Sequence, residues 1–128
     1  MLTRIVLSLL ATTLVVYNKK LKRSIVVDAR GLSLYMFASD TPGSPPACIP
    51  QRDPVCADIW PALTTADRPI AGKGIRSALL STSTWPDGTT LQVTYNGHPL
   101  YYFHGGHGFS AGDRKAGQIR GQGVAALW

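Results

Sequence analysis

The chain contains no glutamate, and all seven of its acidic residues are aspartates. Glutamine and lysine, which are also good helix formers, are sparse, whereas threonine, valine, tyrosine and isoleucine are frequent. This bias argues against a helical domain and favours β structure. The 13 glycines and 9 prolines favour short elements joined by many turns. The expected fold class is therefore mostly β.

The sequence also lacks the short motifs of several enzyme classes. It contains no G-x-S-x-G nucleophile motif, no phosphate-binding G-x4-G-K-[ST] loop and no G-x-G-x-x-G dinucleotide fingerprint. Paired carboxylates for hydrolysis need a cleft and a raised pKa on one partner, and the sequence points to neither. We therefore expect a non-enzymatic protein, and a hydrolase is the weakest of the alternatives.

No apolar run is long enough to cross a membrane as a helix. The longest, Ile5 to Val16, is short, rich in serine and threonine, and follows the single charge of Arg4. It is similar to the charged and apolar regions of a secretory signal, although no A-x-A cleavage site follows. We expect residues 1–11 to be a degenerate or truncated signal and the first strand to begin near Thr12. The expected location is outside the cytosol, in the periplasm, cell envelope or extracellular space.

The net charge of the chain is +6, which attracts anions such as nucleic acid, lipid head groups or acidic envelope polymers. No nucleic-acid-binding module is recognisable, so a nucleic-acid partner is disfavoured. Four cations cluster between two apolar stretches. They are Lys19, Lys20, Lys22 and Arg23. This cluster is either a solvated hairpin tip or an anion-binding finger.

Two segments of the chain repeat the pattern V-x3-G-x2-L-Y-x-F, from Val27 to Phe37 and from Val93 to Phe103. Each copy is followed by a loop rich in glycine or proline and then by a tryptophan, Trp60 or Trp128. One hairpin alone is marginally stable in water, so two halves would need to share a core. We expect two hairpin-plus-loop units, residues 12–63 and 75–128, packed into one small antiparallel β domain spanning 12–128.

Individual elements follow from local patterns. Strands are expected at Leu32–Ala38 and Ile75–Thr82 because these segments are rich in apolar residues. The strongest hairpin signal is Asn96-Gly97, between strands at 91–95 and 98–103. The glycine-rich stretch from 104 to 123 is expected to be irregular.

Two constellations are candidates for chemistry. Cys48 and Cys56 lie eight residues apart across a proline-rich loop, and are either a disulfide or two free thiols. His104 and His107, with Asp113, offer imidazole and carboxylate ligands suited to Zn²⁺ or Cu²⁺. Glycine-rich loops position ligands poorly, so no cofactor is firmly expected. The alternative function is a periplasmic metal- or haem-related accessory protein that uses His104 and His107.

The segment Leu34-Tyr35-Met36-Phe37-Ala38-Ser39-Asp40 fits the signature Y-x-[FWY]-x-x-D, and the second copy has Gly106 in place of the acid. From about Thr12 to Trp128 the chain resembles the secreted repeat of unknown function, a family of predicted bacterial lipoproteins. The resemblance implies a paired Cys48 and Cys56 and an exported protein without an assigned activity. It identifies the signature residues as Tyr35, Phe37, Asp40, Tyr101 and Phe103.

Three features depart from the pattern of that family: the missing acid, a longer and more basic loop from Gly105 to Arg120, and an end at Trp128 where the family runs on. The simplest expectation for Asp40 is a structural role, in which its carboxylate accepts hydrogen bonds from backbone N–H groups just after a strand ends. The leading functional hypothesis is a non-enzymatic binding or structural module. Its expected partner is an anionic envelope polymer or a protein, and the sequence leaves its oligomeric state open.

Overall fold

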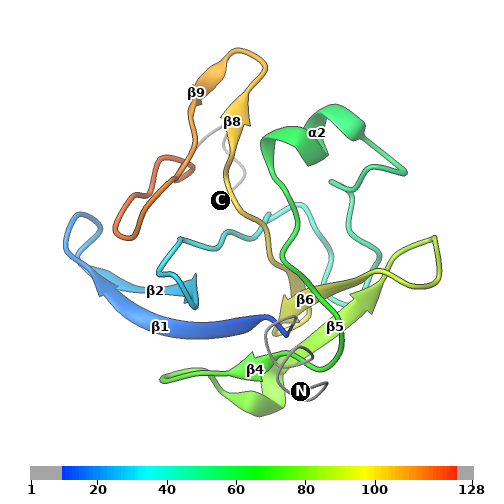
Figure 1. The fold of residues 1–128 in the computed structure, drawn as a ribbon, viewed down its shortest axis with the longest axis horizontal. Coiled ribbons are helices and arrows are strands. Elements are labelled where there is room, and N and C mark those ends of the chain that lie inside the picture. Colours follow the sequence, from blue (N-terminus) through cyan, green and yellow to red (C-terminus); the bar gives the residue numbers. More distant parts are fainter. Residues whose placement is uncertain (1–9, 124–128) are drawn as a thin grey trace, which may run out of the picture.

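The computed structural model describes residues 10–123, and most of its regular structure is short strands (Figure 1). The elements are β1 (Thr12–Asn18), β2 (Arg23–Asp28), α2 (Pro54–Ile59), β3 (Thr64–Thr65), β4 (Ile70–Ala71), the 3₁₀ turn η1 (Ser77–Leu79), β5 (Leu80–Thr84), β6 (Leu91–Tyr95), β7 (His98–Pro99), β8 (Gly105–Gly106) and β9 (Phe109–Ala111). The predicted mostly β class with antiparallel pairing is confirmed. Trp128 and all but two residues of the predicted signal segment lie outside the described residues.

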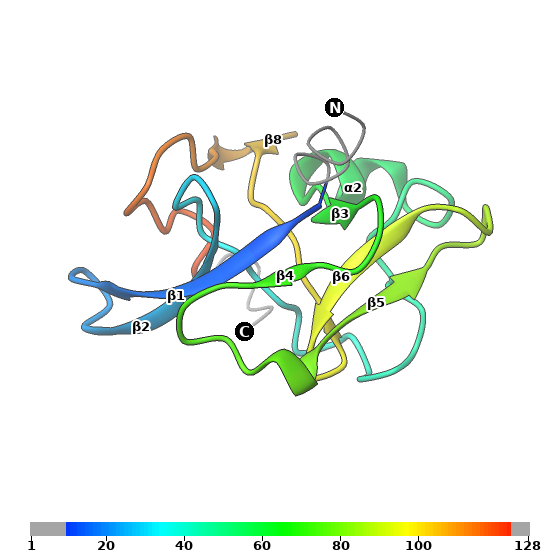
Figure 2. The same cartoon turned by 60° about the horizontal axis from the view of Figure 1, so that its bottom comes forward.

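The β1–β2 hairpin is the longest regular unit, and β1 begins at Thr12 as predicted. Its antiparallel register runs from Thr13 opposite Asp28 to Asn18 opposite Arg23. The Asn18 side chain closes the turn, because its Oδ1 accepts hydrogen bonds from the backbone N–H groups of Lys20 (3.0 Å) and Leu21 (2.9 Å). The short strand β4 pairs with β1 in parallel (Figure 2).

A second sheet is centred on β6, which pairs with β3 and β5 and also with β7. The predicted Asn96-Gly97 hairpin is confirmed between β6 and β7. Both turn residues have positive φ, 50° at Asn96 and 80° at Gly97, as a type I′ turn requires. The returning strand is shorter than predicted, since regular pairing ends at Pro99.

Of two predicted strands, one was wrong and the other was wrong in part. Leu32–Ala38 is not a strand: it makes one isolated bridge to β2 through Ser33 and another through Tyr35 to the second half of the chain. Because the segment changes partner within two residues, no ladder can form. Ile75–Thr82 becomes a strand only from Leu80, because residues 77–79 form η1 first. The stretch from 104 to 123 includes the short β8–β9 pair and is otherwise irregular.

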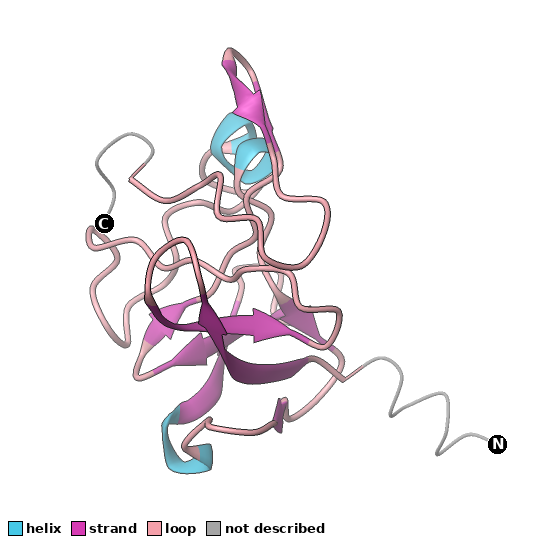
Figure 3. Cartoon of the chain, turned by 90° about the vertical axis from the view of Figure 1, so that its left-hand side faces the viewer, coloured by secondary structure: helices cyan, strands magenta, loops and turns pink. Residues whose placement is uncertain are grey.

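The sequence patterns did not predict the short helix α2. The Asp53 carboxylate caps it by accepting a hydrogen bond from the Cys56 N–H (3.1 Å), and Pro54 occupies its first turn. The helix contacts β8, so α2 and the β8–β9 pair lie together at one end of the molecule (Figure 3). Most strands lie toward the opposite end.

The core consists of two clusters that draw residues from both predicted halves. The first contains Tyr35, Phe37, Cys48, Ile59, Trp60, Tyr101 and Phe103. The second contains Leu34, Leu63, Val93 and Leu100. A shared core is what the repeat pattern led us to expect, although the twofold relation between the halves stays a prediction.

Candidate functional site

The two tyrosines that align in the sequence repeat face each other in the core. The Tyr35 N–H donates to the Tyr101 carbonyl and the Tyr101 N–H donates to the Tyr35 carbonyl, both at 2.8 Å. These bonds form an isolated antiparallel bridge between the two signature segments. The two copies of the signature therefore meet in the middle of the molecule rather than on its surface.

Aromatic rings of the signature pack around Trp60. The Trp60 ring meets Tyr35 and Phe37 edge-on, with centroids 5.4 and 5.1 Å away, and lies 4.6 Å from Phe103. Phe37 stacks on Tyr101 at 4.5 Å. All five side chains are at most 3% exposed. Such rings stabilise the core and offer no platform for a ligand.

The signature acid, Asp40, is buried and joins the two halves. Its Oδ2 accepts a hydrogen bond from the Tyr101 hydroxyl (3.0 Å), and its Oδ1 accepts one from the Ala47 N–H (3.2 Å). The carboxylate thus anchors the loop that follows it as well as the facing tyrosine. Its contacts are those of a structural acid.

A reciprocal contact connects Tyr35 with the second half. Its hydroxyl donates to Asp113, and the same hydroxyl accepts a hydrogen bond from the Gly121 N–H (3.1 Å). Asp113 also accepts from the Arg120 N–H (2.8 Å). The acid that is missing at Gly106 is therefore supplied by a residue beyond the β8–β9 pair. Each signature tyrosine donates to an aspartate from the other half.

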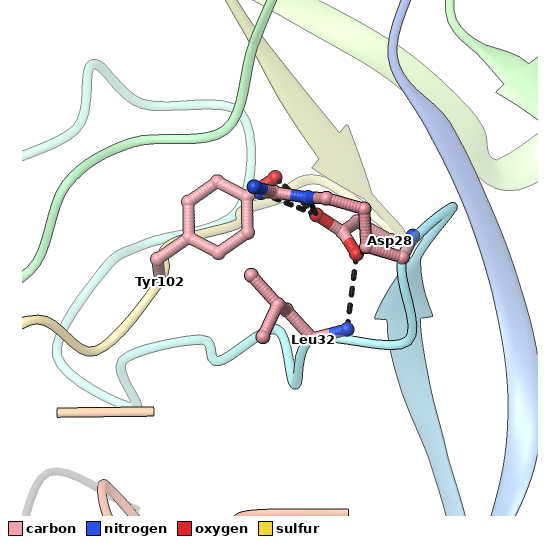
Figure 4. A network of polar contacts seen from close by, with 4 residues as sticks. Asp28, Leu32 and Tyr102 are labelled. Atoms are coloured by element: carbon pink, nitrogen blue, oxygen red, sulfur yellow. Dashed lines mark hydrogen bonds and ion pairs between the residues drawn. The ribbon is translucent and has the colours of Figure 1, made fainter. Parts of the chain in front are cut away.

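A third tyrosine–aspartate pair lies at the end of β2 (Figure 4). Asp28 Oδ2 accepts hydrogen bonds from the Tyr102 hydroxyl (2.8 Å) and from the Arg30 guanidinium (2.9 and 3.1 Å). Its Oδ1 accepts from the backbone N–H groups of Arg30 (2.9 Å) and Leu32 (3.0 Å). No sequence signal pairs Tyr102 with Asp28. We call the pairs Tyr35–Asp113, Tyr101–Asp40 and Tyr102–Asp28 the tyrosine–aspartate seam.

The seam holds its phenols in the neutral form. Burial raises the pKa of Tyr35, Tyr101 and Tyr102 well above the usual value of a tyrosine, and the neighbouring carboxylates raise it further. A phenol with a raised pKa keeps its hydroxyl proton, which it can donate to a carboxylate, and is a poor source of phenolate at physiological pH. The seam is therefore suited to holding the two halves together.

Cys48 and Cys56 form a disulfide, with their Cα atoms 5.3 Å apart. This geometry matches the first of the two alternatives that the sequence left open. Cys48 is buried in the first core cluster, while Cys56 lies in α2. The bond therefore ties the proline-rich loop to the helix. A structural disulfide is typical of an oxidising compartment.

The predicted metal ligands are not brought together. His104 and His107 are exposed, and His107 Nε2 lies 3.5 Å from the Asp58 carboxylate of α2. Asp113 is bonded to Tyr35 instead. Among residues 10–123, no three histidine, cysteine or acidic side chains are close enough to hold a metal ion. The metal site stays a prediction that this arrangement does not favour.

A family comparison bears on the C-terminal part of the chain. Residues 81–128 match a secreted repeat of unknown function. The match confirms the resemblance over this part of the chain and is consistent with an exported protein of unknown activity. No curated protein and no solved structure matches the chain. Within the described part of the chain, no helix is long and apolar enough to cross a membrane.

The segment that matches the secreted repeat lies against the predicted basic finger. Asn18 Nδ2 donates a hydrogen bond to the Gly117 carbonyl (3.2 Å), so the loop around Gly117 sits beside the tip of the β1–β2 hairpin (Figure 1). This loop adds two exposed cations, Arg114 and Lys115, to those of the tip. We call the combined surface the basic face: Lys19, Lys20, Lys22, Arg23, Arg114 and Lys115.

The cations of the basic face are available to a partner. All six are exposed, and within residues 10–123 none of them forms an ion pair. The sequence pattern found the four cations of the tip. It marked the loop that holds Arg114 and Lys115 as basic but did not place it beside the tip, because only the fold brings residues so distant in the chain together.

Proposed function

We propose that this chain is an exported, non-enzymatic binding module whose basic face attaches to anionic polymers of the cell envelope. The observation that carries the proposal is the hydrogen bond from Asn18 to Gly117, which holds two cationic segments side by side. A polymer with repeated negative charges can contact both segments at once. Several weak contacts made together bind far more tightly than any one of them.

The buried chemistry of the molecule supports a role in binding rather than catalysis. The aspartates of the seam, Asp28, Asp40 and Asp113, are engaged by tyrosine hydroxyls and backbone N–H groups. A general acid or base must instead be able to exchange a proton with a substrate. The exposed cations of the hairpin and of the neighbouring loop, in contrast, form no ion pair within residues 10–123.

The test is retention of the full chain on an immobilised anionic polysaccharide and on an uncharged one. We expect retention only on the anionic matrix, with elution by salt, because screening shortens the reach of exposed charges to about 10 Å at 0.1 M. The variant Lys19→Gln/Lys20→Gln/Arg114→Gln/Lys115→Gln should elute at much lower salt than the unmodified protein.

The matched control is Arg52→Gln/Arg68→Gln/Lys73→Gln/Arg76→Gln, which removes the same charge from exposed positions outside the basic face. It should elute close to the unmodified protein. Equal retention of the two quadruple variants would mean that net charge alone determines binding, and the proposal would fail. If the unmodified protein were not retained on any anionic polysaccharide at low salt, a protein partner would be supported instead.

A further inference from the structure

An apolar groove of about 410 Å³ opens beside the basic face. It lies between the β1–β2 hairpin, the segment from Leu34 to Met36, and residues 119–122. Leu34 and Leu100, both buried in the second core cluster, also line it. Six further aliphatic residues that are only half-buried line the groove: Val15, Leu21, Ile25, Val26, Met36 and Ile119.

Such a groove is suited to an apolar ligand. Removal of apolar surface from water is favourable in proportion to the area covered, so an apolar ligand that covers the groove would be stabilised there. Apolar surface gathered in one place, rather than scattered, commonly marks a binding site. The volume lies within the range of about 300–1,000 Å³ that is usual for ligand pockets.

The charged residues around the groove indicate the charge of the ligand's head group. Arg23 is the one lysine, arginine or acidic residue among the described residues that line it. Lys22, the neighbouring cation of the basic face, is exposed. The site therefore combines an apolar surface with a cation and no opposing carboxylate, which complements a molecule with an apolar chain and an anionic head.

We infer that this groove binds the acyl chain of an anionic amphiphile, whose carboxylate or phosphate head pairs with Arg23. The inference deepens the proposed function, and its head-group part rests on that function because Arg23 belongs to the basic face. The apolar part rests on the groove alone. A guanidinium pairs well with either head group, since it can donate two parallel hydrogen bonds.

The first experiment measures binding of palmitate, a palmitoyl lysophosphatidate and neutral monopalmitoyl glycerol to the full chain by calorimetry below their micelle concentrations. We expect saturable 1:1 binding of both anions, and binding of the neutral compound about ten-fold weaker. In Arg23→Gln that difference should disappear. Arg52→Gln, which removes an exposed charge elsewhere, should keep it. If only the phosphate compound binds, the head group is a lipid phosphate; if palmitate binds equally well, a carboxylate suffices.

The second experiment changes the apolar lining. Met36→Glu places a carboxylate in the groove and should weaken palmitate binding at least about ten-fold, because the buried chain would meet an unpaired charge. Val16→Glu is the matched control, since Val16 is an exposed aliphatic residue of β1 that does not line the groove. Thermal melting checks that both variants fold. If Met36→Glu does not fold, Ile119→Glu in the neighbouring loop gives the same test.

The outcomes separate the two proposals. Polymer retention without saturable palmitate binding would overturn the groove inference and leave the proposed function standing. Palmitate binding that persists at high salt, without polymer retention, would support the groove inference and overturn the proposed function. Equal binding of the neutral and anionic compounds would overturn the role of Arg23. Equal weakening by Met36→Glu and Val16→Glu would overturn the placement of the chain in the groove.

Discussion

The tyrosine–aspartate seam and the basic face use their polar groups in opposite ways. In the seam, three buried or half-buried tyrosines donate hydrogen bonds to aspartates, and backbone N–H groups add further bonds to the same carboxylates. On the basic face, six exposed cations have no acidic partner among residues 10–123. The tyrosines and aspartates of the seam are the residues that most resemble catalytic groups in the sequence, but in the structure they stabilise the fold.

The difference has an energetic cause. A buried carboxylate or phenol must be hydrogen-bonded, because leaving it unpaired costs about 1–3 kcal/mol or more. An exposed lysine keeps its hydration, and an ion pair there would contribute little to stability. Substitutions in the core and seam should therefore change the free energy of unfolding. Substitutions on the basic face should change binding.

Trp60→Ala should lower the free energy of unfolding by about 3–5 kcal/mol, because it removes the ring around which Tyr35, Phe37 and Phe103 pack. Denaturant titration followed by circular dichroism measures the loss. Trp60→Phe should cost less because an aromatic ring remains. A loss below about 1 kcal/mol for Trp60→Ala would show that the aromatic cluster does not hold the two halves together.

Cys48→Ala/Cys56→Ala should lower the free energy of unfolding by about 2.5 kcal/mol, the loop-closure value for so small a ring. Reduction of the unmodified protein should give a similar loss. The control is a reducing agent added to the double variant, which should change nothing. A loss that appears in polymer retention rather than in stability would contradict a structural role for this bond.

Tyr101→Phe should cost about 2 kcal/mol, because Asp40 would stay buried with one charged hydrogen bond fewer. Tyr102→Phe should cost a similar amount through Asp28. The matched control is Tyr17→Phe, because Tyr17 is 63% exposed, and this variant should stay within about 0.5 kcal/mol of the unmodified protein. Equal effects at all three positions would remove the distinction between seam and surface.

Alkaline pH should weaken the seam. The pKa of Tyr35, Tyr101 and Tyr102 is raised by folding, so each contributes stability that is complete below the pKa of an unfolded tyrosine, near 10, and is lost as the pH rises through the folded value. At pH 11 the loss should be about 1.4 kcal/mol for each phenol. Unfolding free energies measured from pH 8 to 11 test this. In Tyr102→Phe the slope should be smaller, and an unchanged slope would contradict the assignment.

Features encoded locally could be predicted from the sequence, and features that depend on distant residues could not. The Asn96-Gly97 turn follows from the two residues that occupy it, since both must take positive φ. The pairing of Tyr102 with Asp28 joins residues 74 apart, and the bond between Asn18 and Gly117 spans 99 positions. Neither has a sequence pattern of its own.

The segment from Leu32 to Ala38 illustrates a second limit. Its apolar residues are typical of a strand, yet Ser33 and Tyr35 bridge to different parts of the chain. A pattern of apolar residues reports that a segment is buried and extended. It does not report whether one partner continues alongside, which is what defines a strand. The pattern alone is enough to recognise the signature residues. It does not give their role, because only the fold shows that these residues are buried in the core.

Asn18→Ala changes a residue that serves both the fold and the basic face, and it should have the smallest effect on stability, about 1 kcal/mol. It removes the bond to Gly117 together with the bonds that Oδ1 accepts from the N–H groups of Lys20 and Leu21 in the exposed turn. Its effect on polymer retention should exceed that of an exposed neutral substitution, because Arg114 and Lys115 would no longer be held beside the hairpin tip. Removing those two cations in the Asn18→Ala background should then reduce retention less than in the unmodified protein. Additive losses would mean that the two cationic segments bind independently, and that the Asn18 bond stabilises the fold without organising the basic face.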